Sequence, residues 1–210
     1  AFQDVFNLYD VAGLAHAELY RALAINNTDS NIQSTLLLNL KNQLESFARM
    51  NAQFGHFLLI DSVPHAFGVS IQASLYDELS NTDTFRDMQQ HWLNWALGAN
   101  AWGSTFVVGA GTTFPQCLHH QSANLTGALD GTTPLLLGAV VNGPNDPASI
   151  DDSEEPWDAQ RPCPADGKDV FAPFNNEVWR YVDRVNSWST VEPANDYTIL
   201  SLMAFMRAGG

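Results

Sequence analysis

Two acidic and two aromatic side chains lie close together in residues 181–194, near the C-terminal end of the chain. Asp183 and Glu192 supply the carboxyl groups, and Tyr181 and Trp188 supply the rings. A carboxyl group that must stay protonated near neutral pH needs an apolar or like-charged neighbourhood. Aromatic faces beside such a group suit sugar rings better than phosphates or peptides. The segment therefore indicates chemistry on a glycosidic bond.

The same segment could instead be an ordinary loop. Asp183 could pair with Arg180 or Arg184, which lie beside it in the chain. Glu192 could place a negative charge in the first turn of the last helix, where the helix dipole favours one. Acidic residues are common at helix starts, so this segment alone does not decide between the two interpretations.

A second group of polar and aromatic side chains lies upstream. His119, His120 and Gln121 are consecutive. Histidine can donate to a hydroxyl group or a developing oxyanion, and glutamine can bridge two sugar hydroxyls. Trp102 or Phe114 could stack on a ring. The alternative is a structural loop, held by hydrogen-bonded histidines and glycine turns.

Helical periodicity predicts the elements that position both groups. Apolar residues recur at intervals of three and four in four early segments, and short polar turns separate the segments. Together with a final helix, these segments are about residues 8–25, 32–51, 67–79, 83–97 and 193–206. Pro193 is expected at an early position of the final helix. That helix should carry its apolar side on Ile199, Leu202, Met203 and Met206. The pattern predicts two helical hairpins and a closing helix, and therefore an all-α fold.

Loops should carry the site. Gly, Pro, Asn and Asp dominate the chain from Gly98 to about residue 176, a composition typical of functional loops. Residues 106–108 are β-prone, and residues 135–141 could form a short strand or one buried helical turn. We expect one domain over residues 1–210, with a loop-rich active-site region over residues 101–190.

Charge and composition restrict the partners. The 210 residues carry 9 Lys and Arg against 23 Asp and Glu, a formal net charge of -14. Such a surface repels phosphate backbones and anionic lipid headgroups, so we expect neither nucleic acid nor membrane as a partner. The longest apolar stretches are far shorter than the roughly 20 residues of a membrane helix. Because the chain opens at Ala1 without an apolar leader, we expect either a processed mature protein or a piece of a larger one.

The two cysteines, Cys117 and Cys163, could form one disulfide. Zinc held by Cys117 and His119 is a weaker alternative, because structural zinc takes four ligands and no second Cys/His cluster of the usual spacing exists. The low content of Lys and Arg, with many Asn, Thr and Ser, is compatible with secretion.

Two motifs in these segments resemble the signatures of a known family. The first motif is Thr105-x-Val107-Val108-x-x-Gly111, followed by Leu118-His119. The second motif is Tyr181-x-Asp183, then four residues to Trp188, three more to Glu192, and x-Ala194. Residues 97–100 and 138–144 resemble the connecting segments of the same family. The chain is thus similar to glycoside hydrolase family nine, the inverting cellulases.

The resemblance implies helical hairpins that form the C-terminal half of an (α/α)6 barrel. It implies that Glu192 is the general acid in the hydrolysis of β-1,4-linked glucans. Asp183 would hydrogen-bond a sugar hydroxyl or order the loop of Glu192. The residues expected to bind the sugar are His119, His120, Gln121, Trp102, Phe114 and Trp188.

In that family the general base belongs to an aspartate-rich motif in the N-terminal half, which this chain does not match. Asp151-Asp152 is interpreted as a solvated turn. We therefore expect the missing half, or another copy of the chain, as a partner beside the glucan. No cofactor is expected to be required; calcium is common in the family, but no ligand set is assigned here.

Departures from the family pattern concern sugar contacts. Thr113 and Gln121 stand where the family usually has more strongly polar or basic residues, and Pro193 and Thr198 alter the second signature. An amino sugar or a mixed-linkage glucan is therefore an alternative substrate. A noncatalytic, carbohydrate-binding half-barrel is an alternative of a different class.

Overall fold

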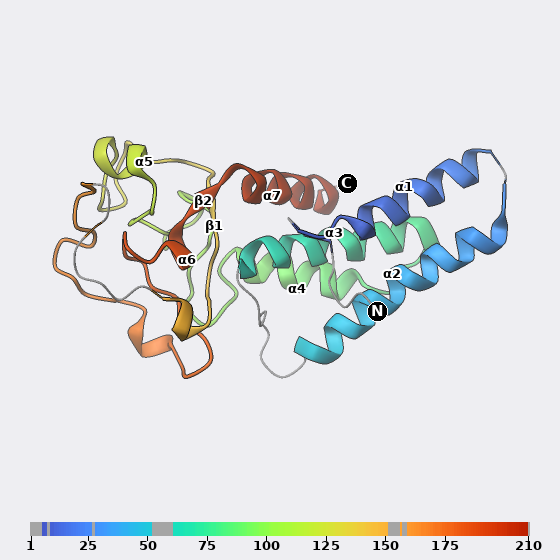
Figure 1. Ribbon diagram of the computed structural model, residues 1–210, viewed down its shortest axis with the longest axis horizontal. Helices are drawn as coiled ribbons and strands as arrows, with labels where there is room; N and C mark the ends of the chain where they lie inside the picture. The colour runs from blue at the N-terminus through green and yellow to red at the C-terminus, as the bar shows by residue number, and fades with distance from the viewer. Residues whose placement is uncertain are drawn as a thin grey trace. The chain divides into compact units, whose positions relative to one another are not determined.

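The computed structural model describes residues 6–7, 9–26, 28–51, 61–150, 156 and 159–209. The described part is mostly helical, with one two-stranded ladder (Figure 1). It forms two compact units. The first comprises the described residues of 1–57, 65–93 and 202–210, and the second those of 58–64 and 94–201. None of the described helices is both long and apolar enough to cross a membrane.

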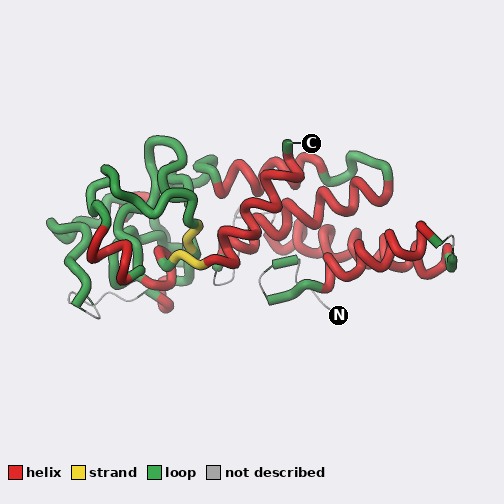
Figure 2. Tube along the Cα trace, turned by 90° about the horizontal axis from the view of Figure 1, so that it is seen from above, coloured by secondary structure: helices red, strands yellow, loops and turns green. Residues whose placement is uncertain are grey.

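The first unit contains the predicted helical hairpin of α1 (Ala12–Ile25) and α2 (Ser30–Asn51), which run side by side in Figures 1 and 2. α1 begins later than the periodicity predicts. The Asn7 side chain accepts hydrogen bonds from the Tyr9 and Asp10 amides, and the Asp10 side chain accepts one from the Ala12 amide. These side-chain bonds hold a turn that delays the helix, as Asn and Asp commonly do.

The predicted apolar stripe of α2 is confirmed as its buried face. Its members are Leu36, Leu40, Leu44 and Phe47. Two buried amides of this core are paired: Gln72 donates to Gln43 at 2.7 Å and accepts from the Phe6 amide at 2.6 Å. The core of the first unit therefore combines an apolar stripe with a hydrogen-bonded amide pair.

Helices α3 (Ser62–Ser80) and α4 (Arg86–Ala96) confirm the second predicted hairpin. α3 starts before the predicted residue 67. Residues 61–73 are buried without interruption, so the helix is covered on all sides and its early part has no polar face for periodicity to detect.

Loops dominate the second unit, as predicted (Figure 2). Two short helices, α5 (Gln121–Thr126) and α6 (Trp188–Val191), and two 3-10 turns, Pro147–Ser149 and Ala172–Phe174, interrupt them. Val140–Val141 forms strand β1, so of residues 135–141, which could have been a strand or a helical turn, only the last two form a strand and none is helical. The β-prone residue Val107 forms a bridge to Val140.

The last helix, α7 (Asn195–Ala208), begins two residues later than predicted. Pro193–Ala194 instead forms strand β2, antiparallel to β1, with Val140 opposite Ala194 and Val141 opposite Pro193. The apolar side that the sequence predicts for this helix is exposed in the structure. Ile199, Leu202 and Met206 are exposed, whereas the buried side consists of Tyr197, Leu200, Ser201 and Ala204.

Candidate active site

Glu192 lies at the junction between a single helical turn and a strand. α6 ends at Val191, and the Glu192 amide donates to the Trp188 carbonyl at 3.0 Å. Its backbone (φ -75°, ψ 120°) is extended, and the chain continues into β2. The residue is half-buried, and within the described residues its carboxylate has no hydrogen bond or ion pair. The acid is thus held by its backbone, while its carboxylate stays available.

The loop of the two histidines is attached to this junction. The His119 amide donates to the Val191 carbonyl at 3.1 Å, one residue before the acid. The structure therefore brings together the two groups that the sequence predicts as a site, although they lie far apart in the chain.

The two histidines present their rings in opposite tautomers. His119 Nδ1 donates to the Val185 carbonyl at 2.7 Å, so in the neutral ring Nε2 is the acceptor. His120 Nδ1 accepts from the Ala123 amide at 3.1 Å and caps α5, so in the neutral ring its Nε2 carries the proton. Both rings are half-buried. A donor nitrogen and an acceptor nitrogen are the two kinds of group that a sugar hydroxyl can use, since it can both donate and accept.

Asp183 is an anchor for the histidine loop. Its two carboxylate oxygens accept from the Gln116 and Cys117 amides, each at 2.9 Å. Burial, opposed by these two hydrogen bonds and supported by the charge of Asp169, raises the pKa of Asp183 to about 6. Both oxygens are occupied by backbone donors, which favours the expected ordering role over a direct sugar contact.

A disulfide between Cys117 and Cys163 ties the histidine loop to the segment that contains Cys163. Together with Val185 and Leu129, the bonded cysteines form a small apolar cluster. Because both sulfurs are in the disulfide, Cys117 cannot serve as the thiolate ligand of the zinc alternative.

The predicted stacking residues fall into two groups. Phe114 and Trp188 are half-buried, with part of each ring accessible. Trp102, by contrast, is only 5% exposed, and its indole N–H donates to Asn175 Oδ1 at 2.7 Å. A ring that packs inside the unit with its polar atom satisfied is a core residue, which disfavours the expected sugar stacking by Trp102.

Tyr181, like Trp102, is a core residue and does not supply the aromatic face that the sequence suggested beside the acids. Its side chain is fully buried and packs against Phe106, Phe171 and Trp102. Of the two rings that flank the acids in sequence, only Trp188 remains a candidate for contact with a sugar.

A groove begins one residue after Glu192. It has a volume of about 310 Å³ and is lined by His120, residues 136–139, residues 193–195 and Thr198. This volume lies at the lower end of the range for small-molecule pockets. Gln121, which follows His120, is exposed at the start of α5.

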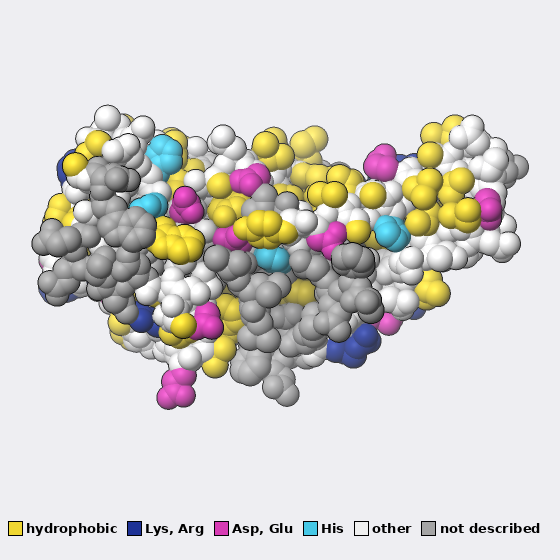
Figure 3. All heavy atoms as spheres, in the orientation of Figure 1, with side chains coloured by type: hydrophobic (Ala, Val, Ile, Leu, Met, Phe, Trp, Pro, Cys, Tyr) yellow, Lys and Arg dark blue, Asp and Glu magenta, His cyan; other side chains and the backbone are white. Residues whose placement is uncertain are grey.

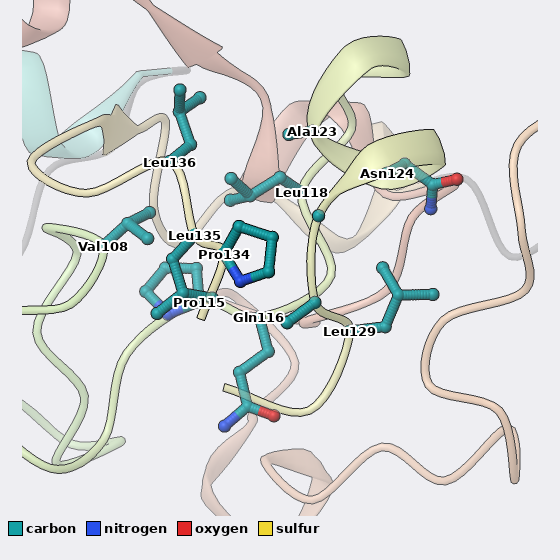
Figure 4. A pocket seen from close by; sticks show the side chains of 12 residues that line it. Val108, Pro115, Gln116, Leu118, Ala123, Asn124, Leu129, Pro134, Leu135 and Leu136 are labelled. Atoms are coloured by element: carbon teal, nitrogen blue, oxygen red, sulfur yellow. The ribbon is translucent and has the colours of Figure 1, made fainter. Parts of the chain in front are cut away.

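A smaller cavity lies beneath the loops. Apolar side chains, among them Val108, Leu118 and Pro134, surround it, whereas the Asn124 amide points away (Figure 4). The Asn124 side chain instead exchanges hydrogen bonds with the Arg161 backbone. At about 20 Å³ the cavity has room for one water molecule and not for a sugar ring, so it belongs to the interior packing.

Asp151-Asp152 lies outside the described residues. Among the residues that the structure does describe, no group of three or more His, Cys, Asp and Glu side chains is placed to hold a metal ion. No calcium site is assigned here, and no step below uses one.

The family is decided by a match over nearly the whole chain. Residues 4–205 match the model of "Glycosyl hydrolase family 9". The chain belongs to this family. The chain is similar to Endoglucanase 10 of Arabidopsis thaliana, 37% identical over 84 residues, which are 33% of this chain and 16% of that protein. Endoglucanase B of Cellulomonas fimi is 34% identical over 93 residues, 40% of this chain and 9% of that protein.

Solved structures of family 9 proteins show the same fold. The catalytic domain of Clostridium thermocellum CelT superposes with a TM-score of 0.62 at 15% identity, over 97% of this chain and 41% of that one. The cellulase Cel9M of C. cellulolyticum in complex with cellobiose superposes with a TM-score of 0.58 at 16% identity, over 99% and 42%. The all-α fold predicted from the sequence is confirmed as that of the family 9 (α/α)6 barrel, and the chain spans less than half of each of these relatives.

Proposed function

We propose that this family 9 chain carries the acid side of a catalytic centre that hydrolyses β-1,4-glycosidic bonds in glucans. The observation that carries the proposal is the position of Glu192. Its carboxylate is half-buried and free of partners within the described residues, its backbone is fixed at the α6–β2 junction, and the histidine loop is bonded beside it. A carboxyl group so placed can give its proton to a glycosidic oxygen.

In an inverting glycosidase, a second carboxylate activates water on the opposite face of the sugar, roughly 6.5 to 9.5 Å from the acid. We assign Asp183 the ordering role instead, because each of its oxygens accepts a backbone hydrogen bond from the histidine loop. We infer that the base belongs to a segment of the protein beyond this chain. His119 and His120 would hold the hydroxyls of the ring at the cleavage point, and Trp188 and Phe114 would cover its faces.

The test replaces Glu192 by Gln in the full-length protein that carries this chain. Hydrolysis of soluble β-1,4-glucan should fall by about 10³-fold or more, while glucan binding changes little, because the amide keeps the shape but cannot donate the proton. Glu177→Gln, which changes an exposed acid of the same unit, is the matched control and should keep full activity.

Retained turnover by Glu192→Gln would remove the acid assignment. The anomer released first, followed by NMR, separates inversion from retention: the α-anomer supports the proposed mechanism, and the β-anomer contradicts it. Reducing-sugar release across a panel of glycans distinguishes cellulose-type glucans from the mixed-linkage and amino-sugar alternatives.

We also propose that the partner of this chain is the remainder of its barrel. The chain covers 41% or 42% of two solved relatives. In the first unit, large apolar side chains are exposed at and along the α1–α2 hairpin, and Figure 3 shows hydrophobic side chains on the surface over these helices. These exposed apolar side chains are Val11, Leu19, Ile25, Ile32 and Leu38. An exposed apolar surface of this kind is normally covered by another element.

Secretion follows as part of the same proposal. The Cys117–Cys163 disulfide is the kind of bond that persists in oxidising compartments and is rare in the cytosol. A polymeric glucan as substrate also fits an enzyme that works outside the cell.

The noncatalytic alternative has one observation in its favour: the described residues offer an acid without a partner base. Under that hypothesis the full-length protein would bind glucan with no release of reducing ends. Turnover that depends on Glu192 excludes it.

A further inference from the structure

Asp61 is a buried acid that the proposed mechanism does not use. Only 2% of the residue is exposed. Its Oδ1 accepts from Asn142 Nδ2 at 2.8 Å and from the Tyr197 hydroxyl at 3.0 Å. Asn142 and Tyr197 are buried as well. A carboxylate, an amide and a phenol therefore form a polar cluster inside the second unit, which we call the Asp61 cluster.

The chemistry of the three groups fixes their orientation. The amide nitrogen of Asn142 donates to Asp61 Oδ1, so this side of the amide faces the carboxyl group. The same nitrogen lies 3.3 Å from the Tyr197 oxygen, which accepts from it while donating to Asp61. Each of these donor groups has an acceptor within the triangle, whereas the buried Asn142 Oδ1 has no hydrogen-bond partner among the described residues.

The Asp61 cluster is joined to Glu192 through the β1–β2 ladder. Val140 lies opposite Ala194, and Val141 lies opposite Pro193. Continuing this register by one residue places Asn142 opposite Glu192. Tyr197 lies in the first turn of α7, shortly after the acid. Asn142 thus follows the strand that pairs with the Glu192 segment, and Tyr197 lies in the helix that comes after Glu192.

The start of α3 secures the Asn142 side of this arrangement. The Val63 amide and the Ser62 hydroxyl both donate to the Asn142 carbonyl, at 2.9 and 3.3 Å. Gly143 follows with φ +87°, and a Cβ there would stand 2.4 Å from Val63 Cγ2. The residues that follow β1 are therefore held against the start of α3.

Asp61 itself has a backbone φ of +59°, in the left-handed region that non-glycine residues seldom adopt. Conformations of this kind persist where surrounding contacts enforce them, and they concentrate at functional sites. The hydrogen bonds to Asn142 and Tyr197 are contacts of this kind, which hold Asp61 in place.

We propose that Asp61 is a positioning residue for Glu192. Through Asn142 on one side and Tyr197 on the other, it fixes the spacing between β1 and the segment that carries the acid. Asp61 touches no substrate in this role. The inference rests on the proposed function of Glu192 and extends it.

The test exploits the dependence of acid catalysis on the leaving group. When a glucan is cleaved, the leaving sugar oxygen is a poor alkoxide leaving group unless the general acid gives it a proton. The acidic phenol of an aryl cellobioside depends much less on that proton. In the full-length protein, Asp61→Asn should lower kcat on glucan by about 10- to 100-fold with little change in KM, and should lower kcat on the aryl substrate by less than about 3-fold. Tyr197→Phe keeps the ring and loses only the hydroxyl, so it should show the same pattern if Asp61→Asn folds poorly.

Ser104→Ala is the matched control, since it removes a buried hydroxyl of the same unit outside the cluster. It should leave both substrates unaffected. The proposal is overturned if Asp61→Asn or Tyr197→Phe keeps normal kcat on glucan, or loses activity equally on both substrates as a general loss of folded protein would cause. Glu192→Gln, measured in parallel, separates the two claims: if it retains glucan turnover, the proposed function fails, whatever the Asp61 variants do.

Discussion

At the scale of the residue, the sequence indicates which side chains come together, but it does not indicate the partners of each one. The spacing of Asp183, Glu192 and the histidines places them in one region, and the structure connects them by backbone hydrogen bonds. Their roles depend on burial and partners, which spacing does not contain. Trp102 illustrates the limit, because only the contact with Asn175 shows that its ring lies in the core.

The Asp61 cluster lies beyond sequence reasoning for the same reason. Asp61, Asn142 and Tyr197 are separated by 55 to 136 positions in the chain. None of them stands in a spacing that indicates chemistry. The ladder register places Asn142 opposite Glu192, and hydrogen bonds link Asp61 to Asn142 and Tyr197.

Asp183 gives a prediction at this scale. Its pKa is raised to about 6 in the folded chain, above the ordinary value of 3.8, chiefly by burial. The folded state therefore holds this proton more tightly than the unfolded state. The stability that this proton contributes is present at low pH and is lost as pH rises from about 4 through about 6.

The measurement compares the free energy of unfolding of the wild type and Asp183→Asn between pH 3 and pH 8. The wild type should lose up to about 3 kcal/mol relative to the variant across that interval, with no further change above about pH 7. A difference that is independent of pH, or that grows in favour of the wild type as pH rises, would contradict the assigned shift.

At the scale of the element, helices with a polar face were predictable and the short elements were not. α2 exposes one face and buries the other, so its stripe is visible in the sequence. α3 is buried on all sides in its first half, and its start was therefore predicted too late. Pro193 fits the start of a helix by local rules, yet pairing with Val141 draws it into a strand, a tertiary interaction that local propensity does not contain.

Gly143 gives a prediction for the ladder. It has φ +87°, and a Cβ would stand 2.4 Å from Val63 Cγ2 and 2.9 Å from Ser62 Oγ. Gly143→Ala should destabilise the chain by about 2–4 kcal/mol, because it adds backbone strain to a steric clash. Thermal or denaturant unfolding measures the loss.

Gly167→Ala serves as the control for that variant. Gly167 also has a positive φ, +69°, but a Cβ there meets nothing within 4 Å. Its cost should be only about 1–2 kcal/mol, from the backbone alone. Equal losses for the two variants would show that the contact with α3 contributes nothing.

At the scale of the whole molecule, the family match and the exposed apolar hairpin lead to one expectation. The natural protein should have an intact mass well above the 23.1 kDa of this chain, or should copurify with the segment that completes the barrel. Mass spectrometry of the protein from its source measures this. A mass of 23.1 kDa with no accompanying chain would instead favour the carbohydrate-binding half-barrel.

The central claim is that Glu192 donates the proton to the leaving oxygen, and a ratio of rates tests it most directly. The full-length Glu192→Gln variant is assayed on β-1,4-glucan and on an aryl cellobioside with an acidic phenol. The account predicts a loss of about 10³-fold or more on glucan and a far smaller loss on the aryl substrate, since that leaving group departs without a donated proton. An equal loss on both substrates, or full activity on glucan, would contradict the role of Glu192 as the general acid.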